Sequence, residues 1–334
     1  MADITIIMPS YNKEKYIEEA LNSVFMQETT YDYHIIVADD CSTDKTIDIV
    51  KEYQTKYPDK ITLLTSDKNQ KLYKNVRRAY AITKTDYFCV LDPDDFWIDK
   101  HKIQKSLDFL EKNKDYTIYV TDTILQLPDG SRKKYIKRKK VINSTFDDFL
   151  NKKAALGCTL GSTFRNVVFK NGLPDKMIDL PTETSEQTFR GDAFRSIIHL
   201  QKGKAHCVPC EDAVYRMTEE GLWQGSTKLN QGLLTANLNK DMWIYFDKKY
   251  PQFLFKSYCA FNSAVNNLAD SLSEINKDEK ILQTAKKITD LKKIYEENSD
   301  LIKELSKKHT PLRYKIRKYI CEKLSEKLKK KGFI

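Results

Sequence analysis

Three carboxylates stand within four residues in the segment Asp92-Pro93-Asp94-Asp95, which directly follows a short apolar run. Carboxylates this close repel one another, so each is costly to ionise beside the others. A divalent cation offsets that cost, and oxygen ligands suit Mg²⁺ or Mn²⁺, which commonly bridge carboxylates to phosphates. The segment therefore favours a site for a metal and a phosphate. A solvated acidic turn that caps the next helix is the simpler alternative.

Strand and helix signals alternate around this segment through the first third of the chain. Five apolar runs predict strands, at Ile4–Met8, His34–Ala38, Ile61–Thr65, Tyr87–Leu91 and Tyr116–Thr121. The segments between these runs have apolar residues at helical spacing, so they predict helices. Such a pattern indicates an α/β fold with a mostly parallel sheet and helices on both faces. Ligands bind these sheets at the carboxyl ends of the strands. Polar groups follow three of those ends, at Ser10-Tyr11-Asn12, Asp39-Asp40 and Asp92–Asp95.

The later part of the chain has a different pattern of strand and helix signals. Leu127–Gly130 predicts a hairpin turn, and Ala205–Val208 and Ala213–Arg216 predict two short strands. From about Thr227 onward the apolar spacing is helical. We therefore expect an α/β domain over residues 1–226 and a helical C-terminal region over residues 227–334.

Several polar residues stand where helices are expected to begin. Asn12 is positioned to cap the first helix, and Thr43 with Asp44 to cap the second. Thr310 and Pro311 have the residue types that open a helix at the C-terminal end of the chain.

The net charge of +10 is concentrated in that last helix. Residues 307–334 hold 11 basic and 2 acidic side chains, so the remaining chain is nearly neutral. Apolar residues recur every four positions among these bases, at Leu312, Ile316, Ile320, Leu324 and Leu328. A basic amphipathic helix of this type binds anionic bilayers, and we expect residues 310–331 to do so. The alternative is a helix packed on its own domain with a solvated basic face.

Other features favour a cytoplasmic protein, at the inner face of the membrane if the basic helix binds lipid. No apolar run approaches the roughly 18–20 residues that span a bilayer. The N-terminus lacks the basic and apolar regions of a signal peptide. Seven scattered cysteines are typical of reduced thiols.

The chain resembles the family 2 glycosyltransferases, which have the GT-A fold. The resemblance rests on residues that follow one another at the family's spacing: Met8-Pro9-Ser10-Tyr11-Asn12, Ala38–Asp44, Asn69 with Asn75, Leu91–Trp97, Lys102-Ile103, Gly191-Asp192, and Tyr215-Arg216 with Gly221-Leu222-Trp223. It implies a Rossmann-like sheet and inverting transfer of a hexosyl or N-acetylhexosaminyl group from a nucleotide-diphosphate donor. The donor expected is a UDP-sugar, and the acceptor is a hydroxyl of a glycan or a lipid-linked glycan.

The resemblance also implies roles for individual residues. Nucleotide contacts fall on Pro9, Tyr11, Asn12, Asp39, Asn75 and Asp92. Asp94 is expected to bind Mn²⁺ or Mg²⁺, with Asp95 as its rival. Contacts with the donor sugar or the acceptor are expected from Ser162, Thr163, Arg165 and Trp223. Thr218 stands where many relatives have a histidine, so Glu219, Glu220 or water would have to supply a third metal ligand.

Asp192 is the residue that the resemblance points to as the general base. An alcohol is a weak nucleophile unless a carboxylate takes its proton, and departure of a nucleoside diphosphate leaves charge that a cation can offset. Glu183 and Glu186 are nearby rivals, and Asp192 has the simpler alternative role of a helix cap.

Two other activities fit parts of the sequence. A nucleotidyltransferase also uses metal-binding carboxylates on an α/β sheet, but it would release diphosphate from a nucleoside triphosphate. A nucleic-acid-binding protein would use the basic C-terminal segment and Arg132–Lys140. The acidic strand ends would repel nucleic-acid phosphates, so no nucleic-acid partner is expected.

Removal of the basic segment tests its role. A chain that ends at Lys308 is expected to lose binding to anionic liposomes, because it lacks both the apolar stripe and most of the bases. Co-sedimentation with vesicles that contain phosphatidylserine measures this loss. Equal partitioning of the full and shortened chains would rule out the membrane role.

Overall fold

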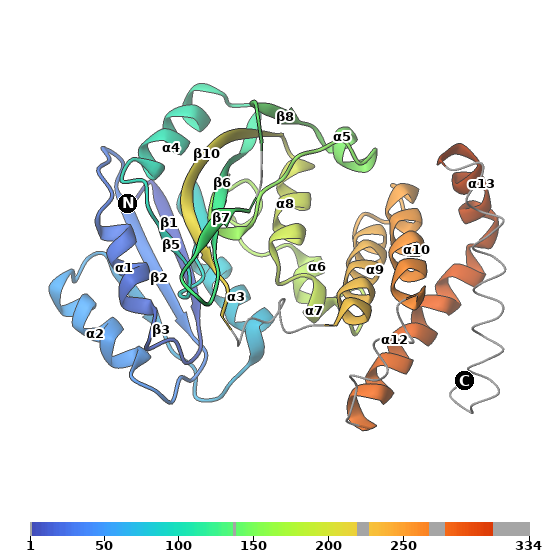
Figure 1. The fold of residues 1–334 in the computed structure, drawn as a ribbon, viewed down its shortest axis with the longest axis horizontal. Helices are drawn as coiled ribbons and strands as arrows, with labels where there is room; N and C mark the ends of the chain where they lie inside the picture. The colour runs from blue at the N-terminus through green and yellow to red at the C-terminus, as the bar shows by residue number, and fades with distance from the viewer. Residues whose placement is uncertain (1, 136–137, 219–226, 267–277, 310–334) are drawn as a thin grey trace. The chain divides into compact units, whose positions relative to one another are not determined.

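The computed structural model describes residues 2–135, 138–218, 227–266 and 278–309, and Figure 1 shows its fold. Internal contacts divide the chain into two compact units. The first comprises residues 1–179 and 189–219, and the second comprises residues 180–188 and 220–334. The short segment 180–188 thus belongs with the C-terminal helices, although it lies within the α/β part of the sequence.

A ten-stranded sheet runs through the first unit. Its strands are β1 (Ile4–Ser10), β2 (Tyr33–Asp39), β3 (Ile61–Leu64), β4 (Tyr87–Val90), β5 (Phe96–Trp97), β6 (Tyr116–Gln126), β7 (Arg132–Lys134), β8 (Ile142–Ser144), β9 (Ser162–Arg165) and β10 (Lys204–Arg216). Their order is β3-β2-β1-β4-β9-β6-β10-β5, with β7 on β6 and β8 on β10. The first four strands in this order are parallel, whereas β9 is antiparallel to both of its neighbours, so the sheet is mixed.

Helices pack on both faces of this sheet (Figure 1). They are α1 (Ile17–Phe25), α2 (Thr46–Lys56), α3 (Lys71–Ile82), α4 (Lys102–Lys112), α5 (Phe146–Leu150), α6 (Asp175–Ile178) and α8 (Asp192–Leu200), with a 3₁₀ turn at Thr159–Gly161. Ile4, Ile6 and Met8 of β1 join one core with apolar residues of α1, α2 and α4. On the other face, Phe88 of β4 contacts Tyr80 of α3 and His199 of α8.

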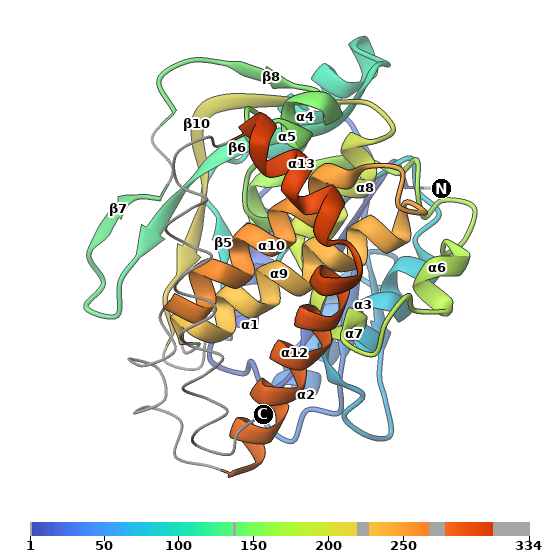
Figure 2. The ribbon, with the colours of Figure 1, turned by 90° about the vertical axis from the view of Figure 1, so that its right-hand side faces the viewer.

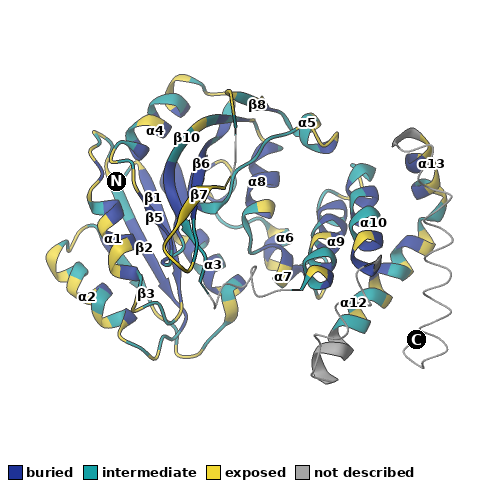
Figure 3. Cartoon of the chain, in the orientation of Figure 1, coloured by how far each residue is buried: buried dark blue, intermediate teal, exposed yellow. Residues whose placement is uncertain are grey.

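Burial on both faces explains the unbroken apolar run at the start of the chain. All seven residues of β1 are buried, and Figure 3 shows β1 as a dark blue strand inside the sheet. A strand covered on both sides needs apolar residues at successive positions rather than alternating ones. The sequence therefore predicted this strand and its central place correctly.

The parallel register brings three strand ends to one edge. Ser10 pairs with Asp39 in the ladder of β1 and β2, and Ile7 pairs with Val90 in the ladder of β1 and β4. The residues that follow each strand therefore emerge side by side, as the sequence predicted for a parallel sheet.

The predicted helix caps at Asn12 and Thr43 are wrong, whereas Asp44 Oδ1 does accept from the first N–H of α2, that of Thr46, at 3.0 Å. The predicted opening of a helix at Thr310 and Pro311 lies outside the described residues. Asn12 has φ 51°, in the left-handed region, and α1 begins only at Ile17. Asn12 instead joins two loops, because its N–H donates to Ser42 Oγ at 2.8 Å and its Oδ1 accepts from the Thr43 N–H at 2.8 Å. Helix α2 likewise starts beyond Thr43, at Thr46. These side chains form the loops at the sheet edge rather than helix ends.

Two predictions for the middle of the chain fared differently. The hairpin turn at Leu127–Gly130 is confirmed, because β6 and β7 pair antiparallel across it. The two predicted strands around Pro209 are one strand, β10, with register shifts between Cys207 and Ala213. Proline has no N–H to donate to a neighbouring strand. Because Pro209 lies where the ladder bulges, that N–H is not needed and the strand continues past it.

The second unit is helical, as expected for the C-terminal region. Its elements are α7 (Ser185–Thr188), α9 (Lys228–Tyr245), α10 (Pro251–Asn266), α12 (Asp278–Glu297) and α13 (Ser299–His309). Helices α9 and α10 lie side by side in Figures 1 and 2. Gly232 permits their close approach, since a Cβ there would stand 2.6 Å from that of Ala264. Among the described helices, none combines the length and apolarity that crossing a membrane requires.

A buried polar network joins segment 180–188 to α9. Asp241 accepts hydrogen bonds from Thr182 Oγ1 at 2.6 Å and Thr188 Oγ1 at 2.7 Å. Lys240 Nζ lies 3.3 Å from Asp241 Oδ1 and donates to Thr184 Oγ1 at 3.0 Å. Both charged side chains are almost completely buried. A buried pair of charges persists only when hydrogen bonds satisfy it, and three threonines do so here.

Replacing Asp241 by alanine should destabilise the second unit. The substitution leaves the buried Lys240 ammonium without its counter-charge and removes the carboxylate that accepts from two threonine hydroxyls, at a cost of about 3 kcal/mol or more. Urea unfolding followed by circular dichroism measures the change. Asp290→Ala is the matched control, because Asp290 is exposed on α12 and its loss should shift unfolding by less than about 0.5 kcal/mol. Equal effects of the two substitutions would contradict the network's role.

Candidate functional site

The acidic turn Asp92–Asp95 lies at the edge where the parallel strands end. The Asp95 N–H donates to the Asp92 carbonyl at 2.9 Å, which closes the turn directly beyond β4. Asp92 and Asp94 are partly exposed, whereas Asp95 is buried. The three carboxylates therefore have different surroundings although they are adjacent in sequence.

Asp95 faces inward and secures the turn to the end of β10. Its Oδ1 accepts from the Arg216 N–H at 2.8 Å, and Arg216 Nη1 donates to the Asp94 carbonyl at 3.1 Å. Burial and the charges of Asp92 and Asp94 raise the pKa of Asp95 well above its usual range. Asp95 thus positions the turn, whereas Asp94 is partly exposed, and which of the two binds a metal stays a prediction.

Asp92 and Asp94 are the carboxylates that face the edge. Burial and the charge of Asp94 raise the pKa of Asp92 to about 6, and the charge of Asp192 adds to this effect. Lys13, from the loop after β1, lies with its Nζ 2.7 Å from Asp94 Oδ2. The site therefore concentrates negative charge that a bound cation would offset.

These residues fit a cation that also binds phosphate. Within the described part of the chain, no group of three or more His, Cys, Asp or Glu side chains gathers in a way that could hold a metal. Asp94 and Asp92 supply two carboxylates, which suffices for Mg²⁺ or Mn²⁺ when phosphate oxygens and water complete the coordination. Glu219 and Glu220, the expected substitutes for a third ligand, lie outside the described residues.

Asp192 is the first residue of α8 and lies near the acidic turn. The N-cap is Gly191, so the expectation that Asp192 itself caps the helix is not met in that form. Asp192 Oδ1 accepts from the Ala193 N–H at 2.7 Å, and the side chain remains partly exposed. Its charge contributes to the raised pKa of Asp92, after burial and the charge of Asp94.

Arg195 lies one turn along α8 and was missed in the sequence. Its side chain is buried at 2% exposure, and it donates to the Tyr80 hydroxyl at 2.9 Å and to Thr159 Oγ1 at 3.2 Å. The charges of Asp192 and Asp92 act with Tyr80 to raise the pKa of Arg195. This guanidinium therefore compensates both carboxylates from beneath. The available signal was an arginine three residues after Asp192 on an otherwise apolar helix.

Two residues expected to contact the nucleotide are turned into the protein. Asp39 is fully buried, and its two oxygens accept from the Ser42 N–H at 2.8 Å and Ser42 Oγ at 2.5 Å. Asn75 is also buried, and its amide donates to the Ala38 carbonyl at 2.6 Å. Both side chains shape the loops at the strand ends, and their contact with a nucleotide stays a prediction.

The loop after β1 keeps its expected exposure. Tyr11 is 45% exposed and Asn12 is partly exposed, whereas Pro9 is buried within β1. Tyr11 therefore offers an aromatic ring at the edge, next in sequence to the residues that fix the loop.

The predicted sugar and acceptor contacts are not brought together. Ser162 and Thr163 are buried in β9, and Ser162 Oγ donates to the Cys158 carbonyl at 2.9 Å. Arg165 pairs with Tyr87 at the opposite edge, because β9 runs antiparallel to β4 and carries the chain away from the acidic turn. Trp223 lies outside the described residues.

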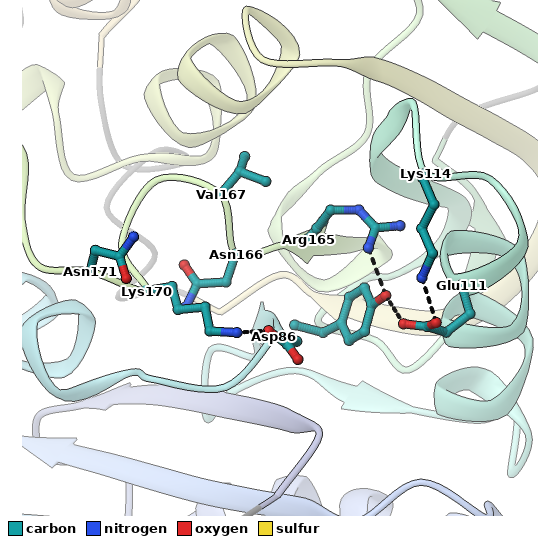
Figure 4. Close-up of a pocket in the computed structure, with 9 residues that line it drawn as sticks. Asp86, Glu111, Lys114, Arg165, Asn166, Val167, Lys170 and Asn171 are labelled. Carbon is teal, nitrogen blue, oxygen red and sulfur yellow. Dashed lines mark hydrogen bonds and ion pairs between the residues drawn. The ribbon is translucent and has the colours of Figure 1, made fainter.

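Arg165 instead lines a cavity of about 420 Å³ at that opposite edge (Figure 4). Its Nη1 donates to the Tyr87 hydroxyl at 2.8 Å, and the Tyr87 hydroxyl also bonds Glu111. An ion pair between Lys170 and Asp86 lies at the same cavity. The prediction that Arg165 contacts donor or acceptor is therefore not met at the carboxyl edge.

A buried ion pair supports the acidic turn from below and was also missed. Lys102 Nζ lies 2.8 Å from Asp212 Oδ2, and Thr121 Oγ1 donates to Asp212 Oδ1 at 2.6 Å. The Asp212 carbonyl accepts from the Ile98 N–H at 2.9 Å. The pair thus ties α4, β6 and β10 to the segment that follows the turn. Lys102 is visible in the sequence, but its partner is 110 positions away.

Residues 5–173, just over half of the chain, match the family model described as Glycosyl transferase family 2. The dTDP-rhamnosyl transferase RfbG of Shigella flexneri is 35% identical over 156 residues, which are 46% of this chain and 52% of that protein. The uncharacterised protein Rv1520 of Mycobacterium tuberculosis is 25% identical over 223 residues, or 67% of this chain and 61% of that one. The matches thus span less than two thirds of these relatives.

Two solved structures share the fold. Staphylococcus aureus TarS 1–349 in complex with UDP-GlcNAc has a TM-score of 0.61 at 17% identity, covering 86% of this chain and 80% of that one. The mannosyltransferase PcManGT from Pyrobaculum calidifontis, in complex with GDP-Man and Mn²⁺, has a TM-score of 0.53 at 16% identity, covering 90% and 84%. The GT-A fold expected from the sequence is therefore confirmed, together with the C-terminal helices.

The surroundings of Asp92 predict a gain in stability when it is neutralised. In protein freed of cations with EDTA, Asp92→Asn should raise the free energy of unfolding at pH 8 by about 1–3 kcal/mol, because a raised carboxyl pKa means that ionisation destabilises the folded state. The gain should fade as the pH falls through about 6 and be small near pH 4, which is close to the ordinary pKa of 3.8 that Asp92 has in the unfolded chain. Urea unfolding at pH 4, 6 and 8 measures it, and a loss of stability at pH 8 would contradict the electrostatic cost.

Proposed function

The chain belongs to glycosyltransferase family 2, and from this we propose that it transfers a sugar from a nucleotide-diphosphate donor to a hydroxyl group with inversion. One observation carries the proposal. The acidic turn follows β4 at the edge where a parallel sheet binds ligands, and Lys13 from the loop after β1 pairs there with Asp94 at 2.7 Å. This arrangement supports a cation site at the turn, with Asp192 at the start of α8 as the candidate general base.

Asp92 and Asp94 would hold Mn²⁺ or Mg²⁺ together with the donor diphosphate. Such a cation supplies Lewis-acid stabilisation of the negative charge that develops on the departing phosphate. Asp95 keeps the turn in place through its bond to Arg216, and Lys102 with Asp212 supports the same segment. Tyr11 and Asn12, which remain exposed in part beside the turn, are available to the nucleoside.

Asp192 acts as the general base in this proposal. The acceptor oxygen attacks the anomeric carbon while the bond from that carbon to the diphosphate oxygen breaks, and the acceptor's proton passes to the Asp192 carboxylate. A single displacement of this kind inverts the configuration.

The donor proposed is a UDP-hexose or UDP-N-acetylhexosamine. TarS 1–349, one of the structural neighbours, is known in complexes with UDP and with UDP-GlcNAc. RfbG is named as a dTDP-rhamnosyl transferase, and PcManGT is known in complex with GDP-Man. Sugars linked to dTDP or GDP are therefore the competing donors.

The acceptor proposed is a bacterial surface glycan or its lipid-linked precursor. Relatives include a putative teichuronic acid biosynthesis glycosyltransferase, TuaG of Bacillus subtilis, and the poly(ribitol-phosphate) beta-N-acetylglucosaminyltransferase TarS. The basic residues of 310–331 would bring the enzyme to the inner face of the membrane, where such acceptors are lipid-linked.

A donor panel combined with a base variant tests this function. Thermal unfolding with UDP-, GDP- and dTDP-sugars and Mn²⁺ should show the largest stabilisation for a UDP-sugar, and EDTA should remove it. Asp192→Asn should keep that stabilisation but lose about 10²–10⁴-fold in turnover, because it removes only the proton acceptor. Glu183→Gln and Glu186→Gln test the rival bases. Substantial turnover in Asp192→Asn, or its loss in either glutamate variant alone, would remove Asp192 from this role.

A further inference from the structure

Lys13 places a positive charge at the carboxylates where a divalent cation is expected. Its Nζ lies 2.7 Å from Asp94 Oδ2, and each of the two side chains is only 19% exposed. Lys13 comes from the loop after β1 and Asp94 from the turn after β4, so the ion pair joins two of the strand ends at this edge. Lys13 therefore does part of the neutralisation that a cation would otherwise supply.

The backbone that carries Lys13 is fixed, so only its side chain is free to move. The Lys13 N–H donates to Thr46 Oγ1 at 2.7 Å, and Thr46 Oγ1 in turn donates to Asp44 Oδ1 at 2.5 Å. Asn12, one position earlier, is held by its bonds to Ser42 and Thr43. The flexible four-carbon stem of lysine can still swing its ammonium over several ångströms.

The neighbouring guanidinium groups are held more firmly. Arg195 is buried and donates to both Tyr80 and Thr159. Arg216 Nη1 donates to the Asp94 carbonyl and its Nη2 forms an ion pair with Glu19. Lys13, by contrast, makes its ion pair with Asp94 through the end of a flexible chain. Of these three cations, Lys13 is the one suited to change partner during ligand binding.

We propose that Lys13 is a built-in counter-ion that competes with the divalent cation for Asp94 and transfers to the donor diphosphate when the cation binds. An ammonium and a divalent cation repel each other at one carboxylate, whereas a diphosphate brings new negative charge for the displaced ammonium. The proposal rests on the nucleotide-diphosphate donor of the proposed function. Cation and donor binding then become cooperative, because each favours the same position of Lys13.

Lys13→Gln tests separately the competition of Lys13 with the cation and its transfer to the diphosphate. Titration calorimetry with Mn²⁺ alone should show binding to Lys13→Gln about three- to tenfold tighter than to the wild type, because the competitor for Asp94 is gone. Titration with UDP at saturating Mn²⁺ should show binding about three- to tenfold weaker, because the displaced ammonium no longer meets the diphosphate. A purely structural role would move both affinities in the same direction.

Lys15→Gln is the matched control. Lys15 is exposed two positions further along the same loop, so its loss changes the net charge equally and should leave both affinities within about twofold. Lys13→Arg keeps the charge and should keep Mn²⁺ binding near the wild-type level, which separates charge from side-chain packing. Thermal unfolding of each variant confirms that it is folded.

Each possible result supports or overturns one part of the proposal. Unchanged or weaker Mn²⁺ binding in Lys13→Gln would overturn the competition with the cation. Tighter Mn²⁺ binding with unchanged UDP binding would overturn the transfer to the diphosphate. If the wild type binds no nucleotide or nucleotide sugar but Lys13→Gln still binds Mn²⁺ more tightly, the proposed function fails while the competition for Asp94 is supported.

Discussion

Repulsion among the carboxylates of one turn is the constraint that shapes the edge of the sheet. Asp92, Asp94 and Asp95 cannot all face solvent as free anions without cost, and burial in the first unit increases that cost. The structure treats each differently. Asp95 is withdrawn and bonded to the backbone of β10, Asp94 is paired with Lys13, and Asp92 is left with a raised pKa. Ionising all three carboxylates therefore remains costly in this turn.

The rest of the first unit holds this turn against its own repulsion. The ion pair of Lys102 with Asp212 joins α4 to β10 beneath the turn, and Arg195 of α8 brings a buried guanidinium under Asp92 and Asp192. These groups are charged because a neutral core could not compensate the carboxylates above it. In the second unit, the buried pair of Lys240 with Asp241 fixes segment 180–188, which precedes the helix of the candidate base by a few residues. Charge pairing thus recurs wherever loops must be held still.

The predictions succeeded where the physical signal is local. The apolar runs of β1, β2 and β4 identified buried parallel strands, because a strand covered on both faces needs continuous apolar residues. The helical spacing after residue 227 identified the second unit's helices in the same way. The predictions failed for loops. Asn12 and Thr43 have the residue types of helix caps, but they bond to each other across 31 positions, a pairing that only tertiary structure creates.

The sequence alone determined that acidic and polar residues follow the carboxyl ends of parallel strands, since apolar strands that alternate with helices imply a parallel sheet. It also determined the family, through Met8–Asn12, Asp92–Asp95 and Gly191-Asp192. Tertiary structure decided how those side chains are bonded. Asp39 accepts from Ser42, Asn75 donates to the Ala38 carbonyl and Asp95 accepts from the Arg216 N–H, so all three turn inward. Arg165 leaves the edge because β9 runs antiparallel to β4. Hydrogen-bond demands across the fold leave no mark in the local sequence.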